Sequence, residues 1–177
     1  MSWRLSAEEA GLLVVDAQEK LVAAVAEPTD WVKKLTILVE GAKILGLPIC
    51  ITEQVPSKLG KTMPVILKAA GNGCKPVAKT FFSAVDQGKS LGKKRILVAG
   101  CEAHVCLLQT ALALLEDEFE VWVVTDACSS RTERNRDAAF DRLAGAGAEL
   151  LTTEMVAFEW LRHADHPQFR AVQALIK

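Results

Sequence analysis

The feature that most constrains the fold is an unbroken apolar run, AGLLVV over residues 10–15, which stops abruptly at Asp16. A strand that is apolar at every position, and not only at every second one, has to be covered on both faces. Further short β-rich runs follow at residues 47–52, 76–79, 95–100, 120–125 and 148–151. Helical stretches separate most of them, so the alternation predicts an α/β fold with a six-stranded parallel sheet.

Helices are expected at residues 30–45, 64–69, 103–116, 130 to 145 or 147, 154–162 and 167–176. Asp30 is a suitable N-cap for the first, and SRTE over residues 130–133 has the pattern of a capping box. The connection between residues 52 and 76 is long and rich in Pro and Gly, which favours a binding loop or lid over a plain linker. Because the chain contains no internal repeat or linker, residues 1–177 are expected to form one domain.

Charge and hydropathy limit the class of partner. The chain has 21 basic and 22 acidic residues and a formal net charge of -1, which gives no electrostatic footprint for nucleic acid or an anionic membrane. No apolar stretch approaches the roughly 20 residues of a membrane span, and the N-terminal segment lacks the features of a signal peptide. We therefore expect a cytoplasmic protein that binds a small molecule, without nucleic-acid or membrane partners.

The cysteines are an odd number in a chain without an export signal, which argues against a disulfide framework. Each is then either a small buried hydrophobe or a reactive thiol. The five are Cys50, Cys74, Cys101, Cys106 and Cys128. Position along the predicted elements has to decide between the two roles.

Three chemically useful residues fall at the carboxyl ends of predicted strands, where open parallel sheets bind ligands. Asp16 ends the first strand, Lys79 ends the third, and Cys106 opens the helix after the fourth. A cysteine in the first turn of a helix lies near the positive end of the helix dipole, and a nearby lysine would lower its pKa further. We therefore expect Cys106 to have the lowest pKa of the five thiols, with the carboxylate as its base.

Each of these residues also has an ordinary interpretation. Cys106 could be a buried structural cysteine, Asp16 a cap or turn residue, and Lys79 a solvated cation. His104 could be read as the base, although a neighbour at a helix start is more often directed away from the thiol. Cysteine and histidine spacing matches no usual zinc pattern, so no metal and no cofactor are expected.

Five segments resemble isochorismatase-like hydrolases in order and spacing: LVVDAQ (13–18), TEQ (52–54), AKTFFS (78–83), AGCEAHVC (99–106) and TDACSSR (125–131). The likeness runs from about Gly11 to Asp141, and EA at 102–103 and HPQFR at 166–170 look most like the isochorismatase-domain-containing subgroup. The resemblance implies a Rossmann-like, three-layer α/β/α fold. It also implies a catalytic triad of Asp16 as base, Cys106 as nucleophile and Lys79 as the charge-stabilising partner, with an amide-like C–N bond favoured.

The resemblance further implies the residues around the substrate. These are Gln18, Gln54, Phe82, Glu102, Ala103, Val105 and Arg131, with an oxyanion hole from backbone N–H groups near Val105 and Cys106. A cis peptide bond is implied between Cys101 and Glu102. Nicotinamidases of the superfamily carry an Asp-x-His metal motif after the second strand, but this chain reads TEQVP at 52–56, which disfavours a metal-dependent nicotinamidase.

Two other functions stay open. A non-catalytic member could serve in assembly or partner binding, and the family's usual threonine is replaced here by Ala103. A redox-sensing thiol protein could use Cys101 or Cys128 as the resolving partner of Cys106. Family members commonly form homo-oligomers, and Trp160 and Leu161, together with the C-terminal segment, are candidates for packing against a neighbouring subunit.

Overall fold

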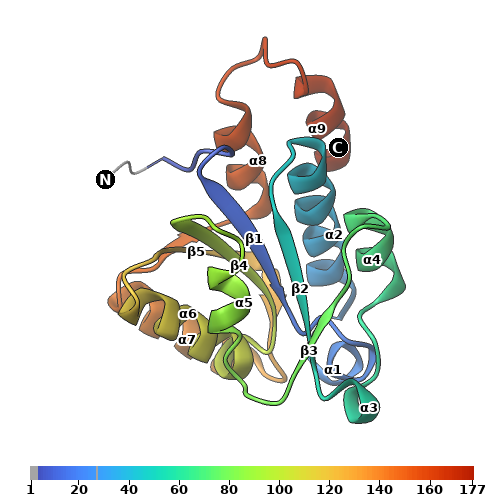
Figure 1. The fold of residues 1–177 in the computed structure, drawn as a ribbon, viewed down its shortest axis with the longest axis vertical. Helices are drawn as coiled ribbons and strands as arrows, with labels where there is room; N and C mark the ends of the chain where they lie inside the picture. The colour runs from blue at the N-terminus through green and yellow to red at the C-terminus, as the bar shows by residue number, and fades with distance from the viewer. Residues whose placement is uncertain (1–3, 27) are drawn as a thin grey trace.

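The computed structural model describes residues 4–26 and 28–177; residues 1–3, which begin the N-terminal segment considered above, and Glu27 lie outside the described residues. A six-stranded sheet has the order β3-β2-β1-β4-β5-β6, and every neighbouring pair is parallel (Figure 1). The strands are β1 (Ala10–Val15), β2 (Ile49–Gln54), β3 (Val77–Lys79), β4 (Arg95–Cys101), β5 (Glu120–Ser129) and β6 (Glu149–Leu151). The predicted α/β class and six-stranded parallel sheet are confirmed.

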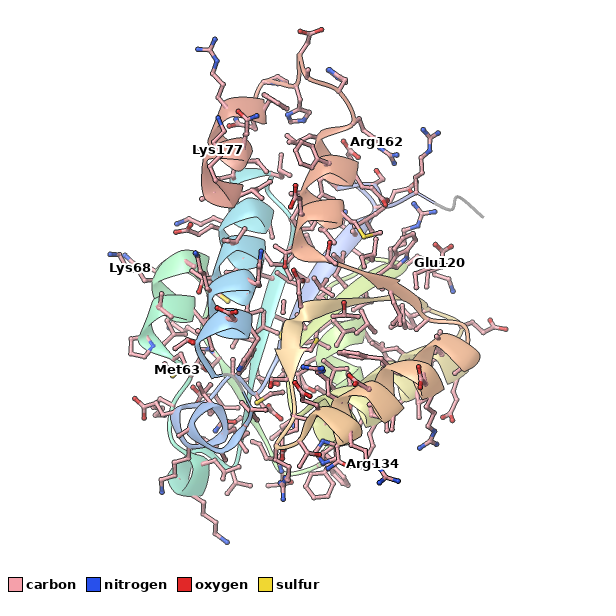
Figure 2. All side chains as sticks on the ribbon, turned by 180° about the vertical axis from the view of Figure 1, so that it is seen from behind. Met63, Lys68, Glu120, Arg134, Arg162 and Lys177 are labelled. Atoms are coloured by element: carbon pink, nitrogen blue, oxygen red, sulfur yellow. The ribbon has the colours of Figure 1, made fainter. Side chains whose placement is uncertain are left out.

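Helices cover both faces of the sheet. The helices are α1 (Glu19–Ala24), α2 (Pro28–Ile44), α3 (Pro56–Leu59), α4 (Pro64–Ala70), α5 (Val85–Lys89), the π-helical η1 (Ala103–Leu107), α6 (Leu108–Glu116), α7 (Glu133–Gly145), α8 (Thr153–Leu161) and α9 (Phe169–Ile176). One layer contains α5, α6 and α7, and the other is built on α2 with α4, α8 and α9 beside it. Figure 2 shows this second layer from behind, with Lys68 on α4 and Lys177 after α9.

The central strands β1 and β4 meet closely at their carboxyl ends. Strands β1 and β4 are buried at every position, and each fully buried Val or Leu side chain contributes about 1.5–3 kcal/mol to folding. At their carboxyl ends Val15 pairs with Gly100, whose φ is +123°, and a Cβ at Gly100 would lie 2.0 Å from the Val15 carbonyl oxygen. The strand order reverses between β1 and β4, which is the switch point where such sheets bind ligands.

Three local expectations are wrong. Helix α2 begins at Pro28, so Asp30 lies in its first turn and is not its N-cap. Strand β5 continues to Ser129 because Cys128 and Ser129 still pair with β4, so α7 begins only at Glu133. Its N-cap is Thr132, whose side chain accepts a hydrogen bond from the Asn135 N–H, and not Ser130 as the capping-box pattern predicted. The connection between β2 and β3 holds α4, as expected, but also the short helix α3, for which no periodicity was visible.

The suggested subunit contact on α8 is also wrong. Trp160 and Leu161 are 3% and 1% exposed, because they pack inward from α8 within the chain's own core. Any contact with a second copy has to use other side chains. Across the two described ranges, no helix combines the length and the apolar character that crossing a membrane requires.

Candidate active site

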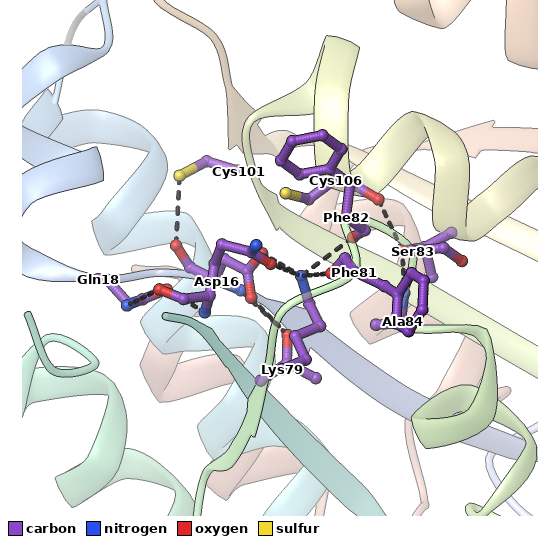
Figure 3. Close-up of polar contacts among 12 residues, drawn as sticks. Asp16, Gln18, Lys79, Phe81, Phe82, Ser83, Ala84, Cys101 and Cys106 are labelled. Carbon is purple, nitrogen blue, oxygen red and sulfur yellow. Dashed lines mark hydrogen bonds and ion pairs between the residues drawn. The ribbon is translucent and has the colours of Figure 1, made fainter. Parts of the chain in front are cut away.

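Asp16 lies at the switch point and its carboxylate is held on both oxygens. The Thr52 hydroxyl donates to Oδ1 at 2.7 Å. The Lys79 ammonium donates to Oδ2 at 2.7 Å (Figure 3). The side chain is fully buried, and the residue has a φ of +48°. A left-handed backbone at a residue other than glycine costs free energy and clusters at functional sites, so this strain marks the end of β1 as a candidate site.

Lys79 is a buried and fully partnered cation. Besides Asp16, its ammonium donates to the Gln54 side-chain oxygen at 2.6 Å and to the carbonyl oxygens of Phe81 at 3.1 Å and Phe82 at 3.0 Å. The Lys79 side chain is only 5% exposed. The interpretation of Lys79 as a solvated surface cation is therefore excluded by its surroundings.

Cys106 lies in η1 and is 5% exposed, with its thiol close enough to the Asp16 carboxylate for the negative charge to affect its pKa. Burial and the Asp16 carboxylate raise the pKa of Cys106 to about 12, while the Lys79 ammonium opposes them. The expectation that this thiol has the lowest pKa is wrong, because burial raises the pKa of Cys50 only to about 11. The lowering of the Cys106 pKa expected from its place at a helix start is outweighed by the loss of hydration and by the negative charge of Asp16. In the absence of substrate Cys106 is therefore a neutral thiol beside a carboxylate.

Two glutamines brace the strand ends. Gln18 donates from its amide to the carbonyl oxygens of Gln54 at 3.0 Å and Gly60 at 2.8 Å, and its side-chain oxygen accepts from the Gln54 N–H at 2.6 Å. Gln54 in turn donates from its amide to the Thr80 carbonyl oxygen at 2.8 Å. The predicted binding residue Gln54 is thus brought to Lys79, whereas the polar atoms of Gln18 are engaged by backbone groups of β2 and the following loop.

Glu102 and Arg131 are brought together beside η1. The guanidinium donates to the carboxylate at 2.6 and 3.0 Å, and the Arg131 backbone N–H donates to it at 3.0 Å. Burial tends to raise the pKa of Glu102, but the hydrogen bonds and charge of Arg131 lower it below the usual value. The peptide bond between Cys101 and Glu102 is cis, as the resemblance implied.

One of the two backbone N–H groups expected to form the oxyanion hole is already hydrogen-bonded in η1. The Val105 N–H donates to the Glu102 carbonyl oxygen at 3.0 Å, so it is already engaged and the expected oxyanion donor at Val105 is corrected. Ala103 is fully buried. The His104 ring contacts the Ser130 hydroxyl at 2.9 Å and the Asn135 amide at 3.4 Å, so its nitrogens are directed toward β5 and α7.

Sequence reasoning missed two positioning residues. Thr52 was part of a recognised motif but received no role, and its contact with Asp16 follows from parallel pairing of β1 with β2. Thr110 donates from its hydroxyl to the Cys106 carbonyl oxygen at 2.6 Å and accepts from the Ala84 N–H at 2.9 Å. Its spacing of four residues from Cys106 within a helical stretch is a signal that could have indicated this contact.

Comparison with known proteins identifies the family of this chain. The family model described as the isochorismatase domain matches residues 10–155. The chain belongs to the isochorismatase family. Isochorismatase domain-containing protein 2A of Mus musculus is 37% identical over 98% of this chain and 85% of its own length. The structure described as MAR1 ribonuclease from Caenorhabditis elegans has a TM-score of 0.94 and 35% identity, over 98% of this chain and 92% of that one.

Two bacterial structures of YcaC add chemical and assembly information about those proteins. The Pseudomonas aeruginosa structure, described with covalent acrylamide, has a TM-score of 0.90 and 28% identity, over 99% of this chain and 92% of that one. The Escherichia coli structure, described as an octameric hydrolase of unknown specificity, has a TM-score of 0.86 and 30% identity, over 98% and 96%. These likenesses support the isochorismatase-like hydrolase fold and do not identify the substrate.

Proposed function

We propose that this chain is a cysteine hydrolase in which Cys106 is the nucleophile, Asp16 the proton acceptor and Lys79 the charge-balancing cation. The observation that carries the proposal is the shared position of Asp16, whose carboxylate contacts both the thiol and, at 2.7 Å, the ammonium. All three groups are almost completely buried. A carboxylate that contacts a thiol and a cation at one sheet switch point is the arrangement that proton abstraction from sulfur requires.

In the proposed first step, Asp16 accepts the Sγ proton while Sγ forms a bond to the substrate carbonyl carbon. The carbonyl π electrons move to oxygen, and we place that oxyanion near the backbone N–H of Cys106. When the carbonyl re-forms, the C–N bond breaks and the Asp16 carboxylic acid returns its proton to the leaving nitrogen. Water then attacks the thioester with Asp16 again as base, which releases a carboxylic acid and the free thiol.

The substrate is proposed to be a small molecule with an amide-like C–N bond. Because Cys106 is 5% exposed, a large substrate could not reach sulfur without displacing protein groups. The covalent acrylamide in the Pseudomonas aeruginosa YcaC structure is consistent with a nucleophile in that relative. Gln54, Phe82, Glu102, Ala103, Val105 and Arg131, together with Gln18, remain the proposed binding residues.

Redox sensing is less well supported than hydrolysis. Cys101 donates to the Asp16 carbonyl oxygen at 3.4 Å, and Cys128 donates to the Val124 carbonyl oxygen at 3.0 Å. Burial raises the pKa of Cys101 well above its usual value and that of Cys128 to about 12. Resolving thiols need thiolate character and access, and both candidates have little of either.

A non-catalytic role and RNA cleavage are the remaining alternatives. A binding protein has no chemical need for a buried carboxylate that holds an ammonium and lies beside a thiol. The name of the Caenorhabditis elegans structure raises RNA as a substrate, but a chain with a net charge of -1 has no overall positive charge that would attract a phosphate backbone. We further propose that the protein is a homo-oligomer, since one relative is described as octameric. We also propose that it is cytoplasmic and uses no cofactor.

A substrate panel tests the proposal directly. Small amides, ureides, esters and a short RNA are offered to the wild type, to Cys106→Ser and to Cys74→Ser, a matched change at a half-buried cysteine on the loop before β3. We expect turnover of an amide or ester that Cys106→Ser loses and Cys74→Ser keeps, with an acyl adduct on the Cys106 peptide by mass spectrometry. Full turnover by Cys106→Ser would refute the nucleophile, and cleavage of RNA alone would favour the ribonuclease alternative.

A further inference from the structure

A cavity of about 560 Å³ lies at the carboxyl ends of β5 and β6. Strand β6 pairs with β5 only from Trp122 to Val124, so among the described residues the last part of β5 has no strand neighbour on that side. Side chains from α2, α7 and α8 border this open edge; Arg134 marks the start of α7 in Figure 2. The carboxyl ends of parallel strands are where such sheets bind ligands, and the volume is within the range of about 300–1,000 Å³ that small-molecule sites occupy.

This cavity is separate from the proposed catalytic site. Asp16, Lys79 and Cys106 are not among the residues that line it. In the sheet, β4 lies between β1, which ends at Asp16, and β5, which borders the cavity. A ligand bound in the cavity therefore does not need the thiol, and its binding does not depend on the proposed hydrolase activity.

Two cations on the cavity walls have bonding capacity left. The Lys34 side chain on α2 is half-buried, and across residues 4–26 and 28–177 it has no hydrogen-bond or ion-pair partner. The Arg136 guanidinium on α7 donates from Nε to Asp137 at 2.9 Å, which leaves its two terminal nitrogens for another acceptor. A carboxylate bound between α2 and α7 would therefore meet positive charge on both helices.

Strand β5 supplies the opposite charge. One carboxylate oxygen of Asp126 accepts from the Thr153 N–H and from the Thr153 hydroxyl, each at 2.8 Å. The second oxygen has no partner in the part of the chain that the structure describes. Because the two bonds to Thr153 fix the side chain at the start of α8, the second oxygen is held in place for an ammonium group. Asp30 on α2 adds an exposed carboxylate to the same cavity.

The remaining wall is largely apolar and includes Trp31, Phe140, Leu150, Leu151 and Met155. Trp31 is 4% exposed, and its indole N–H is buried without a hydrogen-bond partner among the described residues. A buried N–H that lacks an acceptor costs free energy, and a ligand oxygen reached by a small rotation of the ring would remove that cost. The cavity thus combines an apolar surface, a donor without an acceptor, and charges of both signs.

We propose that this cavity binds a small zwitterion with an apolar side group, which is the chemistry of a free α-amino acid such as leucine. The ligand carboxylate pairs with Lys34 and Arg136, and the ligand ammonium pairs with Asp126. The apolar side group packs on Trp31 and Phe140. An acid or an amine alone leaves one of these charged groups without a partner, so each binds more weakly than the amino acid.

Isothermal titration calorimetry tests the site with L-leucine, L-methionine and L-phenylalanine as probes. Isocaproate and isoamylamine, which each carry one of the two charges of leucine, are titrated beside them. We expect one amino acid per chain and weaker binding of the acid and the amine. Lys34→Met and Asp126→Asn should each weaken amino-acid binding by about 10-fold to about 100-fold, the usual worth of a hydrogen bond to a charged group.

Lys33→Met is the matched control, the same change at the next position on α2, where the side chain is exposed and does not line the cavity. This variant should keep the wild-type affinity. Asp16→Asn should keep it too, because that change is confined to the catalytic site. Circular dichroism checks that each variant is folded, and Lys34→Gln replaces Lys34→Met if the latter is not.

Three results would overturn the inference: no saturable binding of any of the three amino acids, an unchanged affinity in folded Lys34→Met and Asp126→Asn, or an equal loss in Lys33→Met. Binding that Asp16→Asn abolishes would place the amino acid at the catalytic site and so would also refute a second site. Isocaproate or isoamylamine binding as tightly as leucine would contradict the zwitterion and with it the assigned charges.

Discussion

Replacing Asp16 by Asn separates the two effects that this carboxylate has on Cys106. In the wild type the negative charge of Asp16 favours the protonated thiol. The same carboxylate is the proposed base during turnover. The amide removes the charge and the base together but keeps nearly the same shape, so the substitution should increase the thiolate population while it lowers turnover.

The size of the first effect follows from the contacts. Burial and Asp16 raise the pKa of Cys106 from 9.0 to about 12, against the opposing charge of Lys79. A like charge at close range shifts a pKa by about 1–3 units, so the midpoint in Asp16→Asn should fall to between about 9 and about 11. Well below both midpoints, each unit multiplies the thiolate fraction by about ten, and alkylation at neutral pH should accelerate by about 10-fold to about 1,000-fold.

The assay follows iodoacetamide modification of Cys106 against pH by peptide mapping, with turnover of any substrate found by the panel measured in parallel. Turnover should fall by about 10²–10⁴-fold, the usual contribution of general acid–base catalysis. Asp126→Asn is the matched control, because Asp126 raises the pKa of Cys128 and accepts hydrogen bonds from Thr153 in α8, whereas it is not among the groups that shift the pKa of Cys106. Alkylation of Cys106 that is slower or unchanged in Asp16→Asn would refute the assigned electrostatics.

The other predictions concern stability and charge. Lys79→Met should cost about 3–5 kcal/mol in urea denaturation, because its carboxylate partner stays buried without a cation. It should also slow alkylation of Cys106, and equal stability would contradict the buried ion pair. Gly100→Ala should cost more than about 4 kcal/mol or abolish soluble protein, whereas Gly73→Ala, where a Cβ meets no atom within 4 Å, should be neutral. Folding raises the pKa of Cys106 and Cys128 from 9.0 to about 12. The contribution of these neutral thiols to the free energy of unfolding is therefore fully present below pH 9 and is lost as the pH rises toward 12. A urea midpoint that stays constant over that range would contradict this expectation.

The fold was accessible from the sequence because its strongest signals are local. Fully apolar runs such as residues 10–15 need cover on both faces, and that requirement alone predicts a parallel sheet between helices. The same logic placed Asp16 and Lys79 at one edge, because the carboxyl ends of parallel strands meet there. Element ends were less accessible, since the extension of β5 to Ser129 depends on pairing with β4 and not on its own residues.

The chemistry of the site was less accessible, because it depends on tertiary distances. Sequence position predicted that Cys106 lies at the candidate site, but it predicted a lowered pKa where the structure gives a raised one. A helix start argues for a thiolate, and only the packed structure shows that burial and Asp16 outweigh it. The carbonyl groups of Phe81 and Phe82 carry no signature in the sequence, since every residue has one. Their role arises from where the segment after β3 runs.

The raised pKa of Cys106 is compatible with a nucleophilic role when the total charge of Asp16, Lys79 and Cys106 is considered. With Asp16 and Lys79 ionised and the thiol neutral, the three side chains carry no net charge. Loss of the thiol proton to solvent would leave a net negative charge in a buried site, and that is the event made difficult by burial and by Asp16. Transfer of the same proton to Asp16 leaves the net charge at zero and places the new thiolate beside the Lys79 ammonium. The arrangement therefore keeps sulfur protonated and slow to react with bulk reagents, and in the proposed mechanism it supplies the thiolate by internal transfer when a carbonyl carbon is in position to accept it.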